Sequence, residues 1–214
     1  MKTAVVATLS IASLALATTA LADREQVHLT RAGQQAARAA VLRPGDVGAT
    51  FTGGARKPTL NTSVACPGFQ PKQSDLVVVG AAETTWKSDT AQFDSEAQVL
   101  ETPRMVHLDW SRTVHSSKVL PCLRRTIVRS LASDQRLSFV TRLPVAQVAP
   151  HARLFRSVIV LRMGSARTPI LLDSLLLGKG RTEITLTTTA PYAARKSVTR
   201  AELRLARLLV RRAS

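Results

Sequence analysis

The chain has 214 residues and a formal net charge of +16 at pH 7, with 30 Lys and Arg residues against 14 Asp and Glu. Hydrophobic residues make up 45% of it and charged residues 21%, which excludes an intrinsically disordered chain. Cys66 and Cys122 are the only cysteines, so a four-cysteine zinc site and a Cys-x-x-Cys redox pair are also excluded.

Residues 1–22 are typical of a cleaved signal peptide. Lys2 supplies a positive start, residues 4–17 are uncharged, and Ala20-Leu21-Ala22 is a small-x-small cleavage signal. The uncharged stretch is shorter than the roughly 20 apolar residues that a membrane helix needs, and no cysteine follows it for acylation. We therefore expect a secreted protein of residues 23–214 that folds as one domain, with no lipid anchor and no transmembrane span.

Export would also place the two cysteines in an oxidising compartment. Disulfides form and persist in oxidising compartments outside the cytosol. Because Cys66 and Cys122 are the only pair in the chain, we predict an intramolecular disulfide between them.

The positive charge lies in the second half of the chain. Residues 23–103 hold 8 basic and 9 acidic residues, whereas residues 104–214 hold 21 basic and 5 acidic residues. Such a field favours anionic partners, here a cell-wall polymer or an acidic lipid surface. Arg outnumbers Lys by 23 to 7, so the alternative that the bias reflects a GC-rich genome stays open. No nucleic acid partner is expected, because few aromatic residues accompany the basic part.

Hydrophobic periodicity predicts an ordered set of elements in the first part of the mature chain. Thr30 is the expected cap of the first helix, and Pro103 the expected first residue of the second. The elements expected here are a helix to about Val41, turns with short strand pieces over 45–75, strands over 76–86 and 93–99, and two helices after Pro103, the second through Leu123, Ile127 and Leu131.

The last third is expected to be mostly sheet, closed by a helix. Strands are predicted over 137–143, 155–163, 170–177 and 182–189, with 170–177 apolar enough for a central strand covered on both sides. Gly178-Lys179-Gly180 indicates a hairpin turn rather than a phosphate loop, because a strand follows it instead of a helix. Thr199 and Glu202 have the spacing of a capping box at the start of the closing helix. The predicted fold class is α+β, a mainly antiparallel sheet backed by N-terminal, middle and C-terminal helices.

The closing helix carries a basic stripe. Its apolar face is expected to hold Leu203, Ala206, Leu209 and Val210. Arg200, Arg204, Arg207 and Arg211 recur at helical spacing on another face, and we predict that they bind an anionic surface. Arg124, Arg125 and Arg129 would extend this field if the middle helix lay alongside.

Two stretches resemble secreted actinobacterial sensor-type domains. They are the hairpin Leu175-Leu176-Leu177-Gly178-Lys179-Gly180-Arg181-Thr182-Glu183-Ile184-Thr185-Leu186 and the earlier Ala39-Ala40-Val41-Leu42-Arg43-Pro44-Gly45-Asp46-Val47. A cysteine near Cys66 followed by an apolar strand is also similar to that family. Its members are related to the extracellular domain of some mycobacterial serine/threonine kinases and to PsbP-like α/β/α sandwiches. The resemblance implies a ligand-binding or scaffolding module without catalytic activity.

Motifs for chemistry are few. There is no Gly-x-Ser-x-Gly and no His-Glu-x-x-His, and His28, His107, His115 and His151 are expected at the surface without a metal. Asp173 interrupts an apolar strand, which favours a salt bridge to an arginine across the sheet over a binding or catalytic carboxylate. No cofactor is expected. The sequence thus favours a non-catalytic exported binding module for a small ligand or the cell envelope, and the alternative is an envelope serine hydrolase with a dispersed triad.

Overall fold

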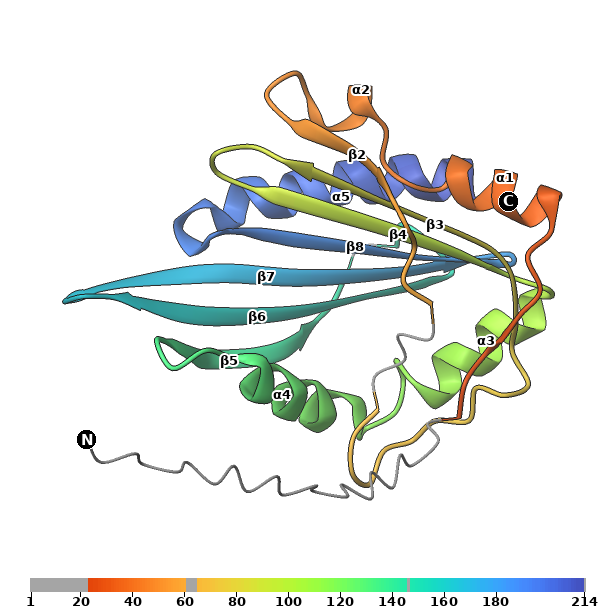
Figure 1. The fold of residues 1–214 in the computed structure, drawn as a ribbon, viewed down its shortest axis with the longest axis horizontal. Helices are drawn as coiled ribbons and strands as arrows, with labels where there is room; N and C mark the ends of the chain where they lie inside the picture. The colour runs from red at the N-terminus through yellow and green to blue at the C-terminus, as the bar shows by residue number, and fades with distance from the viewer. Residues whose placement is uncertain (1–22, 61–64, 146, 214) are drawn as a thin grey trace, which may run out of the picture.

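A computed structural model shows an eight-stranded sheet that runs through the whole fold (Figure 1). The structure describes residues 23–60, 65–145 and 147–213, and the predicted signal peptide lies outside them. The strands follow the order β1-β3-β4-β8-β7-β6-β5, with β2 paired to β3, and only β1 runs parallel to its neighbour. The strands are β1 (Gln26–Val27), β2 (Thr52–Arg56), β3 (Val77–Lys87), β4 (Gln92–Leu100), β5 (Gln135–Leu143), β6 (His151–Met163), β7 (Ala166–Lys179) and β8 (Thr182–Pro191).

Helices cover both faces of this sheet (Figure 1). The helices are α1 (Arg31–Ala39), α2 (Pro44–Val47), α3 (Pro103–Arg112), α4 (Val119–Ser130), the 3-10 turn η1 (Tyr192–Ala194) and α5 (Arg195–Arg212). The apolar core on one face joins α1 and α5 to the sheet, and the core on the other face joins α3 and α4 to it. The predicted α+β class with a mainly antiparallel sheet in one domain is confirmed.

The interior strands alternate between these two cores. In β4 and β8 every second residue is buried against α1 and α5, as the period of two requires. In β7 the side chains of Leu171, Leu175 and Leu177 are buried on that face, whereas Leu172 and Leu176 are only half-buried on the other. The predicted cover on both sides of this strand is therefore complete on one side and partial on the second.

Two glycines allow α1 to lie directly on β3. A Cβ atom on Gly33 would lie 2.1 Å from the carbonyl oxygen of Val79, and one on Gly80 would lie 2.1 Å from the carbonyl oxygen of Gly33. Any larger residue would push the helix off the strand. The predicted cap is confirmed as well, since the amide N–H of Gly33 donates to Thr30 Oγ1 at 3.0 Å.

The closing helix begins earlier than the sequence pattern indicates. Helix α5 starts at Arg195 after Ala194, so Thr199 and Glu202 lie inside it and the predicted capping box is wrong. Thr199 Oγ1 instead accepts a hydrogen bond from Arg156 Nη2 at 2.9 Å. The helix packs on the sheet through Leu205, Ala206, Leu209 and Val210, whereas Leu203 is only half-buried.

Under α5 lies a buried group of one arginine and two carboxyls. Arg156 and Asp173 are cross-strand partners of β6 and β7, and Arg156 Nε donates to Asp173 Oδ1 at 2.9 Å. The Asp173 residue is 0% exposed, which confirms the predicted salt bridge across the sheet. Glu202 completes the group from α5. Its burial, and then the nearby charge of Asp173, raise the pKa of Glu202 to about 8.

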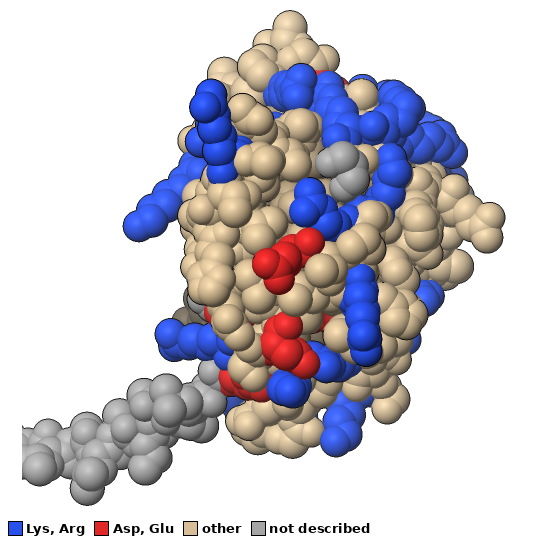
Figure 2. All heavy atoms as spheres, turned by 90° about the vertical axis from the view of Figure 1, so that its right-hand side faces the viewer, with Lys and Arg blue, Asp and Glu red and all other residues tan. Residues whose placement is uncertain are grey.

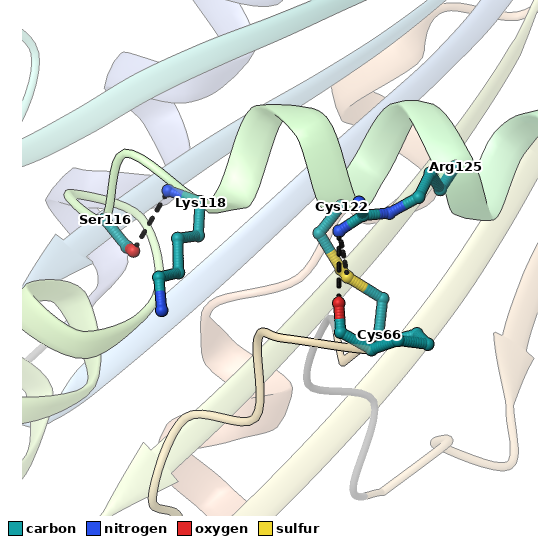
Figure 3. Close-up of a disulfide and its surroundings, with 6 residues drawn as sticks. Cys66, Ser116, Lys118, Cys122 and Arg125 are labelled. Carbon is teal, nitrogen blue, oxygen red and sulfur yellow. Dashed lines mark hydrogen bonds between the residues drawn. A yellow bond between two sulfur atoms is a disulfide. The ribbon is translucent and has the colours of Figure 1, made fainter.

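The predicted disulfide is present. Cys66 lies in the segment before β3 and Cys122 in α4, with their Cα atoms 5.8 Å apart and a sequence separation of 56 (Figure 3). Arg125 Nη2 donates to Cys66 Sγ at 3.1 Å and to the Pro67 carbonyl oxygen at 3.3 Å. The disulfide therefore ties the segment after β2 to the helix layer of α3 and α4. Of the helices that the structure describes, none has the length and apolar character to cross a membrane.

Removing the disulfide should destabilise the fold. In the chain-entropy model a closed loop of this length contributes about 4 kcal/mol, so the Cys66→Ser/Cys122→Ser variant should lose about that much unfolding free energy. Urea unfolding of wild type with and without reductant, beside the variant, measures the loss. Mass spectrometry of the non-reduced protein is the companion assay, and two free thiols or a disulfide-linked dimer would contradict the pairing.

The pKa of Glu202 should make the stability depend on pH. Because the pKa is about 8 in the folded state against an ordinary 4.5, the folded state binds more protons than the unfolded state between these values. The unfolding free energy should then fall as the pH rises through this window, and the Glu202→Gln variant should show a smaller fall. Urea unfolding at about pH 5 and about pH 8 tests this. The exposed Glu101→Gln variant is the control, and an unchanged slope in Glu202→Gln would contradict the assignment.

Candidate ligand cavity

A cavity opens between the sheet and the helices α3 and α4. Its volume is about 270 Å³, slightly below the range of about 300–1,000 Å³ that is typical of small-molecule sites. Strands β4, β7 and β8 form the floor, and α3 and α4 form the opposite wall. It lies on the face opposite α1 and α5, so the buried group around Asp173 is not part of it.

Apolar side chains make up one part of the lining. Trp110 of α3 and Phe155 of β6 are both nearly fully buried and contribute the two aromatic rings. The aliphatic lining comes from Val114, Val119, Leu123, Leu176, Leu177 and Ile184. The apolar wall can therefore hold the hydrocarbon body of a small ligand.

The polar part of the lining contains four carboxyls beside Gln73, Gln98, Thr113, Ser174 and Thr185. Glu96 lies on β4, Glu183 on β8, Asp109 on α3, and Glu25 in the segment that leads into β1. In the register of β4 and β8, Glu183 is opposite Gln98 and Glu96 is opposite Thr185, so these polar residues share one face of the sheet. Of the cavity-lining residues described, none is a lysine, arginine or histidine.

Burial raises the pKa of all four carboxyls. It is the largest cause that raises the pKa of Glu183 well above its usual range, with Asp109 and Glu25 adding to it. Burial also raises the pKa of Glu25 to about 7, helped by the negative charges of Asp109 and Glu96. The pKa values of Glu96 and Asp109 are raised by the same cause. Near neutral pH Glu25 and Glu183 therefore retain part of their protons.

Several buried acceptor atoms in the cavity lack a donor. Gln73 is 1% exposed, and its Nε2 donates to Asp109 Oδ1 at 2.9 Å, whereas its Oε1 has no donor among the described residues. Glu25 Oε2 and Glu183 Oε1 also lack a donor among the described residues, although the Trp110 side chain hydrogen-bonds to the Glu183 carboxyl. Buried polar atoms are nearly always paired in proteins, so three unpaired acceptors around one cavity indicate a bound partner that donates.

Three of the four histidines gather on the far side of Trp110. The ring centroids of His107 and His151 lie 5.9 Å apart, those of His115 and His151 6.4 Å apart, and the Trp110 ring stacks on His151 at 5.1 Å. His115 lies beyond α3, which ends at Arg112, and its backbone N–H donates to the Trp110 carbonyl oxygen at 2.9 Å. Of the described residues, no group of three or more His, Cys, Asp or Glu side chains is placed to hold a metal ion.

The predicted anion-binding stripe is exposed but lies far from the cavity. Arg200, Arg204, Arg207 and Arg211 are all exposed on α5, on the opposite face of the sheet. Arg204 also donates to the backbone carbonyl oxygen of Asp46 at 3.0 Å. Helix α4 belongs to the other helix layer, so Arg124, Arg125 and Arg129 do not extend the stripe. Figure 2 shows one end of the molecule, where Lys and Arg atoms surround a small group of Asp and Glu atoms.

The hairpin between β7 and β8 has a structural role. Gly180 has a φ of 56° at the turn, as the hairpin prediction requires. Lys179 Nζ donates to the backbone carbonyl oxygens of Val210 and Ala213 at 3.1 and 2.9 Å. A cation at these unpaired carbonyls stabilises the C-terminal end of α5.

Comparisons of the chain with known proteins found no match. No family model, curated protein or solved structure matches the chain. The resemblance to secreted sensor-type domains therefore stays a prediction. Serine hydroxyls of the described residues donate to backbone carbonyl oxygens, and Ser88 Oγ shares a hydrogen bond with Thr90 Oγ1. The envelope serine hydrolase stays the alternative prediction.

Sequence reasoning missed the cavity carboxyls. Glu183 alternates with Ile184 and Thr185, a pattern typical of a strand with one face in solvent, and Glu25, Glu96 and Asp109 have no common motif. The one signal that could have pointed to them is the scarcity of acidic residues in the second part of the chain. The second part of the chain holds only five acidic residues, and two of them, Asp109 and Glu183, line the cavity.

Proposed function

We propose that the protein is an exported, non-catalytic binding module that takes up a small ligand in the cavity between the sheet and helices α3 and α4. The observation that carries this proposal is the set of unpaired buried acceptors, Glu25 Oε2, Gln73 Oε1 and Glu183 Oε1, beside an apolar wall. A few convergent polar groups in a mainly apolar cavity are the usual composition of a ligand site. The resemblance to sensor-type domains points to the same class of protein.

Export is part of the proposal. The disulfide between Cys66 and Cys122 is typical of proteins that fold outside the cytosol. It fits the predicted signal peptide at residues 1–22. A non-catalytic role is proposed as well, and labelling with a fluorophosphonate separates it from the serine hydrolase alternative. A binding module should stay unlabelled, whereas a serine hydrolase should react.

A set of three probes tests ligand binding in the cavity. Phenethylamine, phenethyl alcohol and phenylacetate carry a benzyl body with a cationic, neutral or anionic head, and each is small enough for about 270 Å³. At least one should quench tryptophan fluorescence saturably. The Trp110→Phe variant should lose this response, and Trp86→Phe should keep it because Trp86 is buried in the core with α1 and α5.

A variant that fills the cavity is the second part of this test. Thr185 lines the floor on β8, and Thr185→Phe should abolish binding of every probe while urea unfolding stays cooperative. The proposed function is wrong if none of the three probes binds the wild-type protein, or if Thr185→Phe binds them unchanged.

The exposed stripe favours a second contact, with an anionic surface of the cell envelope. Arg200, Arg204, Arg207 and Arg211 point away from the sheet, and like charges at this spacing repel each other by a few tenths of a kcal/mol per pair. A polyanion would relieve this repulsion. We propose weak, salt-sensitive retention on anionic cell-wall polymer or acidic lipid.

Replacing all four stripe residues with Gln should lower the salt concentration at which the protein elutes from a column of immobilised teichoic acid. The matched control replaces Arg104, Arg124, Arg129 and Arg136 with Gln, which removes the same charge from exposed positions elsewhere. Because Arg204 also bonds to Asp46, urea unfolding accompanies both variants. Equal elution of the two variants would show that total charge, and not the stripe, controls retention.

A further inference from the structure

We propose that the cavity binds a small organic ammonium ion, with its charged head among the four carboxyls and its hydrocarbon body against Trp110 and Phe155. This inference rests on the proposed function, because it names the class of ligand that the cavity takes. Three independent features of the described residues carry it: an excess of acceptors, an excess of negative groups, and aromatic faces beside them.

The excess of acceptors calls for a ligand with several donors. Glu25 Oε2, Gln73 Oε1 and Glu183 Oε1 are buried and receive no hydrogen bond from the described residues. Gln73 is decisive among them. It is 1% exposed, its amide nitrogen is already used by Asp109, and an amide oxygen cannot pair itself by taking up a proton. An ammonium group brings up to three N–H donors and no acceptor.

The charged groups that face the cavity are almost all negative. Glu25, Glu96, Asp109 and Glu183 line it directly. Glu83 on β3 lies close enough to Glu96 to raise its pKa further. On α3 the one cation close enough to affect Asp109 is Arg112, and that arginine is paired with Asp75 at 2.6 Å.

The remaining lining side chains carry no charge, and the nearby Arg142 of β5 lies over the Phe155 ring, at 5.6 Å from its centroid. Strand β7 supplies Ser174 and Leu176, β6 supplies Phe155, and α4 supplies Val119 and Leu123. The three histidines lie across Trp110 and outside the lining, where burial lowers the pKa of His115 and of His151. His115 and His151 are therefore mostly neutral near pH 7 and do not balance the carboxyls.

The donor set suits an organic cation better than a metal ion. Among the described residues no three carboxyl, thiol or imidazole groups are placed close enough to share one ion. An ammonium ion tolerates acceptors spread over a larger volume, because each N–H reaches its own partner. The Trp110 ring adds attraction for a cation and for the carbon chain attached to it. The Phe155 ring contributes apolar contact, because the Arg142 guanidinium already lies over it at 5.6 Å from the ring centroid.

Binding of a cation should release protons. In the empty cavity Glu25 and Glu183 keep part of their protons near neutral pH, since burial raises the pKa of Glu25 to about 7 and that of Glu183 well above its usual range. A cation favours the ionised carboxylates and so expels protons to solvent. Affinity for an amine that stays protonated should then rise with pH. A carboxylate ligand would behave in the opposite way, because it would bind the protonated carboxyls and weaken as pH rises.

The experiment is calorimetric titration of the purified protein with phenethylamine, phenethyl alcohol and phenylacetate at about pH 6 and about pH 8, each in two buffers of different ionisation enthalpy. We expect phenethylamine to bind at least about tenfold more tightly than phenethyl alcohol at the higher pH. Its affinity should rise by about tenfold between the two pH values, with release of about one proton on binding.

Variants that remove the charge of cavity carboxyls test whether these carboxyls bind the ammonium group. Glu25→Gln and Glu183→Gln keep the shape of each side chain, and the double variant should bind phenethylamine about tenfold more weakly while affinity for phenethyl alcohol stays unchanged. Proton release should fall as well. Glu101→Gln, an exposed residue, is the matched control and should behave as wild type. Urea unfolding of each variant separates a loss of binding from a loss of folding.

The outcomes distinguish the two proposals. If phenethyl alcohol or phenylacetate binds at least as tightly as phenethylamine, the cavity binds ligands but the cation inference is wrong. It is also wrong if phenethylamine binds without pH dependence or the double variant binds it unchanged. If no probe binds the wild-type protein, the proposed function fails and this inference with it.

Discussion

The covering of both faces of one sheet is the constraint on which the rest of the structure depends. Side chains of a strand alternate between two faces, so a strand with helices on both sides must place every residue in an interior. On the face of α1 and α5 the residues of β4 and β8 are mostly apolar and form a core. On the face of α3 they are Glu96, Gln98, Glu183 and Thr185, and these residues give an otherwise apolar cavity its polar floor.

Features that depend on a local pattern could be predicted from the sequence. Hydrophobic periodicity predicted β3 and β4, and Pro103 predicted the start of α3. The disulfide could be predicted because Cys66 and Cys122 are the only two cysteines. The capping box at Thr199 failed because the same spacing also places both residues on the buried side of a longer helix. There Thr199 and Glu202 meet Arg156 and Asp173, contacts between segments more than 25 residues apart that no local pattern specifies.

The cavity depends on the order of the strands and could not be predicted. Glu183 on a hairpin strand is expected in solvent unless a helix is known to cover that face, and α3 precedes it by about 70 residues. Glu25 reaches the same space only because β1 pairs with the start of β3. His115 likewise comes close to His151 only because α3 ends at Arg112, before His115. The cavity carboxyls could be listed from the sequence, but their proximity in the fold could not be predicted from it.

The basic exterior and the acidic cavity act over different distances, which reconciles a net charge of +16 with a site for a cation. Exposed charges are screened by salt over about 8 Å at physiological ionic strength, so the exterior chiefly slows the approach of a small cation. The cavity carboxyls act at contact distance in a poorly hydrated space, where screening is weak. Added salt should therefore leave the affinity for phenethylamine nearly unchanged while it abolishes retention through the α5 stripe. Titration and elution across one salt series would measure both, and a parallel fall of the two would contradict a buried site.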